Sequence, residues 1–509
     1  MPRQQRNCYF NDARHYYLFA VEPPMRLQDA WRPIDEVAGT GVSTFIYGAS
    51  RDDGLFYPSE VGLPFRSDTP IETELAAYWR VKENMRSLQE AGHDPLGVLI
   101  DRAHEKGMEF FCSMRMGALP GFTRPELLAS STQAVSGSSP GGRGYVHREV
   151  RDHQLAVLTE LANMYPTMEG IELDFAASPG GSGLLFRDGE GNDHSNMMNS
   201  YVSDISAMVH SGGGLLGARV FPTEAMNLRM GLDVKTWLIE GLLDYVVPMF
   251  YLDFVLDCNM PIQWLTTTSH DCSVYPMLQP YYDSEEVGRR LLPTTHHCTL
   301  PQFRAAAANL WAAGADGLYT WFLQWPLQPQ DRAILTELSD PELLIEKDKH
   351  YFIRRRQNLL PPPEGVLDGN VPFDYESFLP IEVSHGDASH FEIPFNIADD
   401  CSNPQVDGVL LRLAVVNLVT ADVVELLLNG KSLSIERSTR RQLGQHVPYE
   451  GQWVEVELHE VRPQQGENTL SFCLSGRPAG LECGVVLEYL EILVSYTLFP
   501  QVSLGQSRL

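Results

Sequence analysis

The chain has 509 residues, 43% of them hydrophobic, and its 38 lysines and arginines stand against 66 aspartates and glutamates, a formal net charge of −28. This length allows several domains and at least one large core. The acidic balance argues against nucleic acid and anionic membranes as partners. No apolar run reaches the ~18 residues of a membrane span, and the N-terminal segment "MPRQQRNCYFNDARHYYLFA" lacks the apolar region of a signal peptide. We therefore expect neither a membrane nor a nucleic acid as partner, and a protein that stays inside the cell or lacks its leader.

The eight cysteines are scattered along the chain, and no C-x-x-C pair occurs among them. Such spacing predicts neither a disulfide framework nor a zinc site. The densest groups of potential ligands are "HDC" at residues 270–272 and "HHC" at residues 296–298. We interpret both as loop and core residues, and we expect no metal and no other cofactor.

Strand-like and helix-like segments alternate through the first two thirds of the chain. Strands are expected at residues 16–20, 44–49, 109–114, 170–175, 216–221, 244–250, 275–281 and 317–323. Helix-period stretches lie between them, for example at residues 74–92, 149–165 and 300–315. This alternation predicts an α/β fold, a (β/α)8 (TIM) barrel, whose usual length of ~250 residues grows with insertions. A doubly wound open sheet is the structural alternative.

The lengths of the predicted connections support the barrel independently. Connections from a helix to the next strand are short, as in "EKG", "PTME" and "AGAD". Connections from a strand to the next helix are long at residues 50–73, 115–148 and 176–199. In a (β/α)8 barrel the long connections lie at the carboxyl ends of the strands, where active sites are built.

The pattern changes towards the C-terminus. The stretch "EKDKHYFIRRRQNLLPPPEG" is rich in proline and charge, and we interpret it as a bridging segment. Beyond it, short alternating runs separated by turn residues, one of them containing an Asn-Gly turn, predict an all-β sandwich. The expected domains are the barrel over residues 1–345, the bridge over 346–379 and the β-sandwich over 380–509.

The fourth predicted strand, "GIELDF", carries two carboxylates on one face. Side chains alternate between the two faces of a strand. The apolar side chains of this strand are expected to pack against the surrounding helices, so Glu172 and Asp174 on the other face point into the barrel. At about 3.3 Å per residue, Asp174 is expected near the rim and Glu172 about 7 Å deeper. Buried carboxylates need partners, and the neighbouring strands offer Arg219 and Arg115. We expect a structural ion pair for Glu172 and a catalytic or substrate-binding role for Asp174.

Further polar and aromatic side chains follow the ends of the other predicted strands. The candidates for the second carboxylate are, in order, Asp253, Glu224 and Asp283. The candidates for contacts to a substrate are Glu172, Arg115, Tyr251, Tyr281, Trp321, Trp325 and His194. The segment "DGEGNDHSN", which contains His194, could also bind calcium or form a solvated loop. Aromatic faces beside carboxylates suit carbohydrate, and glycoside hydrolysis requires an acid together with a second carboxylate as nucleophile or base.

The motifs "EGIELDFAASP" and "PMFYLD" resemble the fourth and sixth strands of the family 18 glycoside hydrolases, which read D-G-x-D-x-D-x-E and M-x-Y-D. Asp174 matches, whereas Glu172 replaces an aspartate and Ala176 stands at the position of the catalytic glutamate. Leu252 replaces the aspartate that ends the second motif. The substrate-assisted chemistry of that family therefore does not carry over to this chain.

A closer resemblance is to the family 10-like glycosyl hydrolases, a broad group of (β/α)8 proteins whose fourth strand reads "GIxxDYxRxP" or "GLELDFxRxP". This sequence keeps "GIELDF" and Pro179, with Asp174 at the position of the group's aspartate and Ala177 where an arginine is often found. The "RM" that begins at Arg115 and the run "GLDVKTWLIEGLLDYVVPMFY" are also similar to that group. The resemblance covers roughly residues 9–327 and implies the barrel fold and glycosidase activity.

These observations predict a glycoside hydrolase that cleaves an oligo- or polysaccharide, with Asp174 as the general acid. Two alternatives stay open. One is a catalytically inactive barrel that binds glycans, with the sandwich as a second binding module. The other is a barrel enzyme of non-glycosidic chemistry, such as a lyase or a deacetylase.

Overall fold

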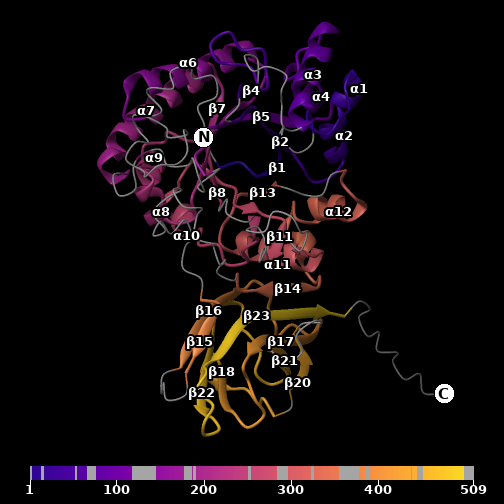
Figure 1. Ribbon diagram of the computed structural model, residues 1–509, viewed down its shortest axis with the longest axis vertical. Helices are drawn as coiled ribbons and strands as arrows, with labels where there is room; N and C mark the ends of the chain where they lie inside the picture. The colour runs from indigo at the N-terminus through magenta and orange to yellow at the C-terminus, as the bar shows by residue number, and fades with distance from the viewer. Residues whose placement is uncertain are drawn as a thin grey trace, which may run out of the picture.

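The computed structural model describes residues 3–12, 17–51, 54–65, 76–116, 145–176, 186, 191–249, 254–283, 296–321, 326–354, 378–384, 390–436, 438–443 and 451–497. An α/β part, formed by the N-terminal portion of the chain, and an antiparallel β part follow one another along the longest axis of the molecule (Figure 1). Strands β14 and β16 lie at the junction between the two parts.

A nine-stranded parallel sheet, here called the curled sheet, forms the centre of the α/β part, in the order β10-β13-β1-β2-β5-β6-β7-β8-β9. Its strands are β1 (Arg6–Asp12), β2 (Thr44–Gly48), β5 (Glu109–Arg115), β6 (Gly170–Asp174), β7 (Leu215–Val220), β8 (Tyr245–Pro248), β9 (Ser273–Val274), β10 (Met277–Leu278) and β13 (Gly317–Trp321). The strands at the two ends of this order, β9 and β10, are separated in the chain only by Tyr275 and Pro276. The backbone N–H of Tyr275 bonds to Val246 of β8 at 2.9 Å, and the carbonyl of Pro276 accepts from Tyr319 of β13 at 3.1 Å. One short segment therefore touches both ends of the sheet.

Helices surround the curled sheet (Figure 1). They are α1 (Leu27–Ala30), α2 (Arg32–Val37), α3 (Ala76–Glu90), α4 (Gly97–Glu105), α6 (Arg148–Met164), α7 (Gly191–Ser211), α8 (Glu224–Arg229), α9 (Val234–Ile239), α10 (Gln263–Thr268), α11 (Leu300–Ala312), α12 (Pro329–Glu337) and the 3₁₀ turn η2 (Pro341–Leu344). Two small antiparallel pairs accompany them, β3 (Ser50–Arg51) with β4 (Gly54–Leu55) and β11 (Tyr281–Asp283) with β12 (His296–His297). Over the described ranges, no helix combines the length and the apolar character needed to cross a membrane.

Six of the eight expected strands are confirmed, because β2, β5, β6, β7, β8 and β13 overlap the predicted ranges. The predicted first strand is wrong. Residues 17–20 form a turn, and the first strand is β1, earlier in the chain. Tyr17 and Phe19 are buried for another reason: Tyr17 donates to the carbonyl of Pro95 at 3.0 Å, and Phe19 packs on Phe56 with ring centroids 6.2 Å apart. Apolar content alone did not separate this packed turn from a strand.

The predicted seventh strand, at residues 275–281, is only partly right. Within this range only β10 and the first residue of β11 are in strands, and β9 ends directly before it. Pro276 stands between the two short strands, and a proline lacks the N–H that a continuous ladder would use.

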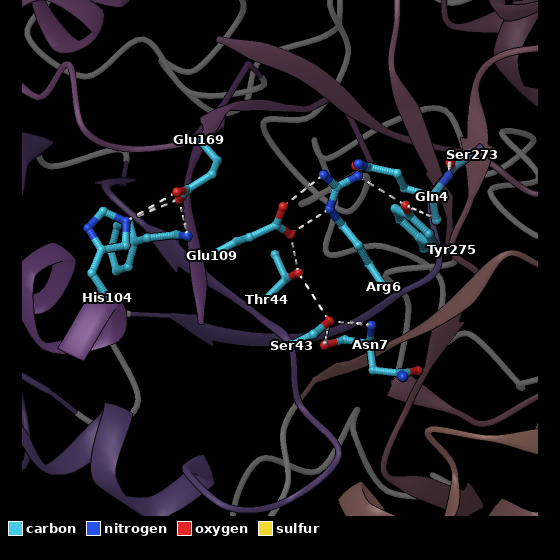
Figure 2. A network of polar contacts seen from close by, with 11 residues as sticks. Gln4, Arg6, Asn7, Ser43, Thr44, His104, Glu109, Glu169, Ser273 and Tyr275 are labelled. Atoms are coloured by element: carbon cyan, nitrogen blue, oxygen red, sulfur yellow. Dashed lines mark hydrogen bonds and ion pairs between the residues drawn. The ribbon is translucent and has the colours of Figure 1, made fainter. Parts of the chain in front are cut away.

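Polar side chains join the amino-terminal ends of four strands of the curled sheet (Figure 2). Arg6 of β1 makes two bonds to Glu109 of β5, at 2.6 and 2.9 Å. Glu109 also accepts from Thr44 of β2 at 2.8 Å, and the backbone N–H of Gln4 donates to Ser273 of β9 at 2.9 Å. This network fastens the end of the sheet opposite to the one where the predicted site lies.

The β part contains a six-stranded sheet, ordered β14-β23-β17-β21-β20 with β15 also on β23, and a four-stranded sheet, ordered β16-β22-β18-β19. Their strands are β14 (Lys349–Phe352), β15 (Ile381–Val383), β16 (Phe391–Ile397), β17 (Val406–Val416), β18 (Val423–Leu428), β19 (Lys431–Ser432), β20 (Thr439–Gln442), β21 (Gly451–Glu457), β22 (Gly466–Gly476) and β23 (Val485–Tyr496). The Asn-Gly turn predicted from the sequence lies between β18 and β19, with Asn429 and Gly430 at φ 51° and 76°. Strand β14 comes from the segment expected to be a bridge, whereas the three domain boundaries stay predictions.

The two parts share direct contacts. Asn309 of α11 donates to the carbonyl of Cys258 at 2.9 Å and to that of Asn396 in β16 at 2.8 Å. Tyr282 of β11 donates to Glu491 of β23 and stacks on Tyr489 with centroids 6.0 Å apart. The β part is thus bonded to α11 and to β11.

One glycine of the curled sheet makes room for a neighbouring ring. A Cβ atom added to Gly217 of β7 would lie 2.0 Å from Cζ of Tyr245 in β8. The tyrosine ring therefore lies over Gly217, at a position that no larger residue can share without displacing it.

We expect Gly217→Ala to lower the free energy of unfolding by about 1–3 kcal/mol, because the new methyl group overlaps the Tyr245 ring in a closely packed interior. Urea unfolding followed by circular dichroism measures this change. Gly408→Ala is the matched control, since Gly408 is also a strand glycine and its added Cβ would meet no atom within 4 Å. Equal effects of the two substitutions would contradict the packing argument.

Candidate active site

The two carboxylates of β6 lie inside the curled sheet. Glu172 is 0% exposed and Asp174 is 1% exposed. The hydroxyl of Tyr319 donates to Oε1 of Glu172 at 3.1 Å, although β13 is separated from β6 by three other strands in the sheet order. Such a contact crosses the interior of the curled sheet. The prediction that this face of β6 points inward is therefore confirmed.

Arg219 of β7 holds both carboxylates. Its Nε lies 2.7 Å from Oε1 of Glu172, and its Nη1 lies 3.2 Å from Oδ2 of Asp174. Its Nη2 donates to the hydroxyl of Tyr319. The expected ion pair between Glu172 and Arg219 is confirmed, and the same guanidinium also binds Asp174.

The register of the parallel strands explains why Arg219 reaches Asp174. Asp174 is paired with Arg219 on one side and with Arg115 on the other, and registered residues of parallel strands lie on the same face. Arg115 is 8% exposed, and its backbone N–H donates to the hydroxyl of Ser50 at 2.9 Å. Two arginines thus flank the carboxylate that ends β6.

Aromatic rings surround the Arg219 guanidinium. Its Cζ lies 3.7 Å from the ring centroid of Phe10, 5.1 Å from that of Tyr319 and 5.4 Å from that of Trp321. These distances are within the range of cation–π attraction, which strengthens when the cation is removed from water. The rings and the carboxylates together compensate the charge of a side chain that is 0% exposed.

Burial sets the protonation behaviour of this cluster. Desolvation raises the pKa of Glu172 above its ordinary value, and the positive charge of Arg219 offsets only part of that shift. Burial lowers the pKa of Arg219, but its interactions with Glu172, Tyr319 and Asp174 together more than compensate, so that its pKa is raised. Burial also raises the pKa values of Tyr245 and Tyr319. Both phenols therefore stay neutral. Each donates a hydrogen bond to Glu172, Tyr319 at 3.1 Å and Tyr245 at 3.2 Å.

The structure describes two of the aromatic residues that were predicted to contact a substrate, Trp321 and Tyr281. Trp321 is 0% exposed, and its ring packs edge-on against Phe10 at 5.1 Å and against Phe254 at 5.2 Å. It forms part of the wall around Arg219 and offers no exposed face to a sugar. Tyr281 is half-buried, with its ring 4.9 Å from that of His297.

The structure places Glu224 away from the buried cluster. It is the first residue of α8, its side chain is 43% exposed, and it lies 3.4 Å from Nζ of Lys235. Its contacts are those of a surface ion pair. His194 of α7 stacks on Phe186 with centroids 4.7 Å apart. Tyr251, Asp253 and Trp325, together with the side chain of Asp283, lie outside the described residues.

Three residues of the cluster were not predicted: Phe10, Tyr245 and Tyr319. Tyr319 shares its strand face with Trp321, so strand alternation could have identified it. Phe10 was missed because β1 was assigned to a later segment. Across the described ranges, no group of three or more histidine, cysteine or acidic side chains is arranged to hold a metal ion.

No family model and no curated protein matches the chain. Among solved structures, the chain is similar to the spore cortex-lytic enzyme SleL of Bacillus megaterium QM B1551, with 11% identity and a TM-score of 0.37 over 66% of this chain and 74% of that chain. It is similar to a chitinase from Chromobacterium violaceum ATCC 12472, with 10% identity and a TM-score of 0.37 over 65% and 98%. It is also similar to an α-L-fucosidase from Vibrio sp. strain EJY3, with 11% identity and a TM-score of 0.39 over 96% of each chain. These structural neighbours are glycoside hydrolases, and at such TM-scores the likeness carries no argument about this chain's activity.

We expect Arg219→Met to destabilise the protein by about 3–5 kcal/mol, because it leaves two buried carboxylates without their cation. Urea unfolding measures the loss. The triple variant Arg219→Met, Glu172→Gln, Asp174→Asn should recover part of it, since neutral side chains replace the uncompensated charges. Arg86→Met, at an arginine that is 57% exposed and paired with Glu83, should leave the unfolding midpoint unchanged.

The raised pKa of Glu172 predicts a pH dependence. Below pH 4.5, its ordinary pKa, the carboxyl is protonated in both the folded and the unfolded state. As pH rises, the unfolded state ionises first, so the stability contributed by Glu172 falls until the raised folded-state pKa is passed. The free energy of unfolding of the wild type relative to Glu172→Gln should therefore decline from pH 4.5 upward and then become constant. A difference that grows with pH would contradict the assignment.

Proposed function

We propose that the curled sheet is a (β/α)8 barrel, that the two antiparallel sheets form a β-sandwich, and that the chain is a glycoside hydrolase. If β9 and β10 are counted as one interrupted strand, the curled sheet has eight parallel positions. Helices follow the strands in the alternating order that such a barrel requires. Tyr275 and Pro276 lie within this interrupted strand, which bonds to β8 on one side and to β13 on the other.

The observation that carries the functional proposal is the position of Asp174. It is the last residue of β6, at the carboxyl end of a parallel strand, where barrel enzymes place their catalytic groups. Arg219 binds it from the neighbouring strand, and Glu172 anchors that arginine one layer deeper. A carboxylate fixed in this way is pre-oriented for chemistry at the rim.

The ion pair suggests how Asp174 would act. As the partner of a guanidinium, Asp174 is assigned here the role of the nucleophile or base, which attacks the anomeric carbon or takes a proton from water, in place of the general acid expected from the sequence. The second acid would then protonate the leaving glycosidic oxygen. Asp253 is our first candidate for that acid, because it comes soon after the carboxyl end of β8 in the sequence, and Asp283 is the next.

A carbohydrate substrate is supported by the motifs that resemble the family 10-like glycosyl hydrolases and by the aromatic residues near the strand ends. Tyr251 and Trp325 are the proposed sugar-stacking residues. Trp321 is reassigned to the support of Arg219, because its ring has no exposed face. We propose an oligo- or polysaccharide as the substrate class, with no cofactor in the reaction.

The second candidate is a catalytically inactive barrel that binds glycans. Two observations favour it: Asp174 is only 1% exposed, and Ala176 stands where the family 18 enzymes have their catalytic glutamate. The two candidates differ in whether a new reducing end is formed when the protein meets a glycan.

A panel of polysaccharides and aryl glycosides, assayed for released reducing sugar, tests the proposal. For any substrate that is cleaved, we expect Asp174→Asn to lower kcat at least about 100-fold, as removal of a catalytic carboxylate does, while ligand binding persists. Glu224→Gln is the matched control and should keep full activity, because Glu224 pairs with Lys235 on the surface.

An Asp174→Asn variant with normal turnover would refute the assignment of the site. Glycan binding without release of reducing sugar by the wild type would favour the inactive binding protein. Products without a new reducing end would point instead to lyase or deacetylase chemistry.

A further inference from the structure

The β part contains a cavity of about 540 Å³. The residues that line it lie far along the sequence from Glu172 and Asp174 of β6. The described residues that line it include Arg440, Arg441 and Arg477, several side-chain amides and the thiol of Cys483, and none of them is acidic. Three arginines thus line one cavity of a chain whose formal net charge is −28.

Arg477 is the most deeply placed of the three. Its side chain is 2% exposed, and its Nε lies 3.5 Å from Oδ1 of Asp422. Its Nη2 donates to the carbonyl of Asn417. Within the described residues, Nε has only this ion pair, and Nη1 is buried without a hydrogen-bond partner. A buried donor without an acceptor is costly, so this guanidinium retains unused capacity to bind an oxyanion.

The other two arginines are exposed. Arg440 and Arg441 belong to β20, the edge strand of the six-stranded sheet. Arg441 is 69% exposed and lies 2.9 Å from Glu455. Exposed guanidinium groups can reorient towards a ligand at little cost, whereas Arg477 is held in place by its buried contacts.

We infer that this cavity binds the carboxylate or sulfate groups of an acidic polysaccharide. The inference rests on the proposed function, from which it takes a polysaccharide as the ligand. The planar guanidinium matches the geometry of carboxylate and sulfate oxygens and binds them through paired, charge-assisted hydrogen bonds. Amide side chains at the same wall can bond sugar hydroxyls. The negative charge elsewhere on the protein is screened over about 8 Å at physiological ionic strength, so the local arginines determine what enters.

The cavity lies at the end of the β part that points away from the α/β part. Strand β22 begins at Gly466, which lines a separate cavity together with Asn309 of α11. The strand continues to Gly476, directly before Arg477. At ~3.3 Å per residue, this run places the arginine cavity about 33 Å from that junction. The cavity therefore holds a distant section of a long polymer and is not a subsite of the reaction.

Isothermal titration calorimetry with polygalacturonate, dextran sulfate and neutral dextran tests the inference on the full chain carrying Asp174→Asn, which prevents turnover. We expect binding of the two acidic polymers, weakened by added NaCl, and none of neutral dextran. The preferred polymer identifies the group as carboxylate or sulfate ester. Arg440→Gln combined with Arg441→Gln should weaken binding by roughly tenfold per arginine, as loss of charge-assisted hydrogen bonds does, whereas Arg86→Gln on α3 should not.

Cys483 provides a second readout at the cavity itself. It is the exposed cysteine of the chain, and the other seven are buried. We expect iodoacetamide to label Cys483 selectively and the bound acidic polymer to slow this labelling, with no protection from neutral dextran. Protection that survives the double arginine substitution would overturn the inference.

The outcomes for this site and for hydrolysis are separable. Acidic-polymer binding that is lost with the arginines supports the cavity even if no glycan is ever cleaved. Cleavage of a glycan by the wild type, without any binding of polygalacturonate or dextran sulfate, overturns the cavity inference and leaves the proposed hydrolase intact. Equal binding of acidic and neutral polymers also overturns it.

Discussion

The buried charge of Arg219 is the constraint on which the interior of the curled sheet depends. A guanidinium without access to water is tolerated only when counter-charges and hydrogen-bond acceptors surround it closely. Glu172 and Asp174 supply the counter-charges, Tyr319 accepts one further bond, and Phe10 lies against the planar face. Losing one member would leave the others buried without compensation, so the cluster behaves as a unit.

This cluster also couples the fold to the chemistry that we propose. Its members come from two pairs of neighbouring strands, β13 with β1 and β6 with β7, and the two pairs meet only because the sheet curls. Tyr245 of β8 joins them through its bond to Glu172, and that bond requires the open space over Gly217. The sheet thus positions Asp174 at the carboxyl end of β6, and the same contacts hold the curled shape together. Rigidity at this point is what a catalytic carboxylate needs.

Much of this arrangement follows from local patterns in the sequence. Period-two alternation placed Glu172 and Asp174 on the inner face of their strand, and the equivalent position on the next strand identified Arg219 as a partner. These predictions succeed because side-chain direction along a strand is fixed by the backbone itself. The first strand was misassigned because the turn containing Tyr17 is as apolar as a strand, and its burial comes from packing against distant residues.

The sequence by itself determined the alternating strands and helices, the inward carboxylates and the antiparallel strands of the C-terminal part, since each depends on neighbours along the chain. Only the tertiary structure decided that Tyr319 and Phe10 reach the cluster across the interior, that Trp321 supports Arg219, and that Glu224 faces solvent beside Lys235. The arginine cavity of the β part was likewise revealed only by the tertiary structure. The contacts around Arg219 and Glu172 join residues 100 or more positions apart in the chain, and they exist only once the sheet has curled and packed.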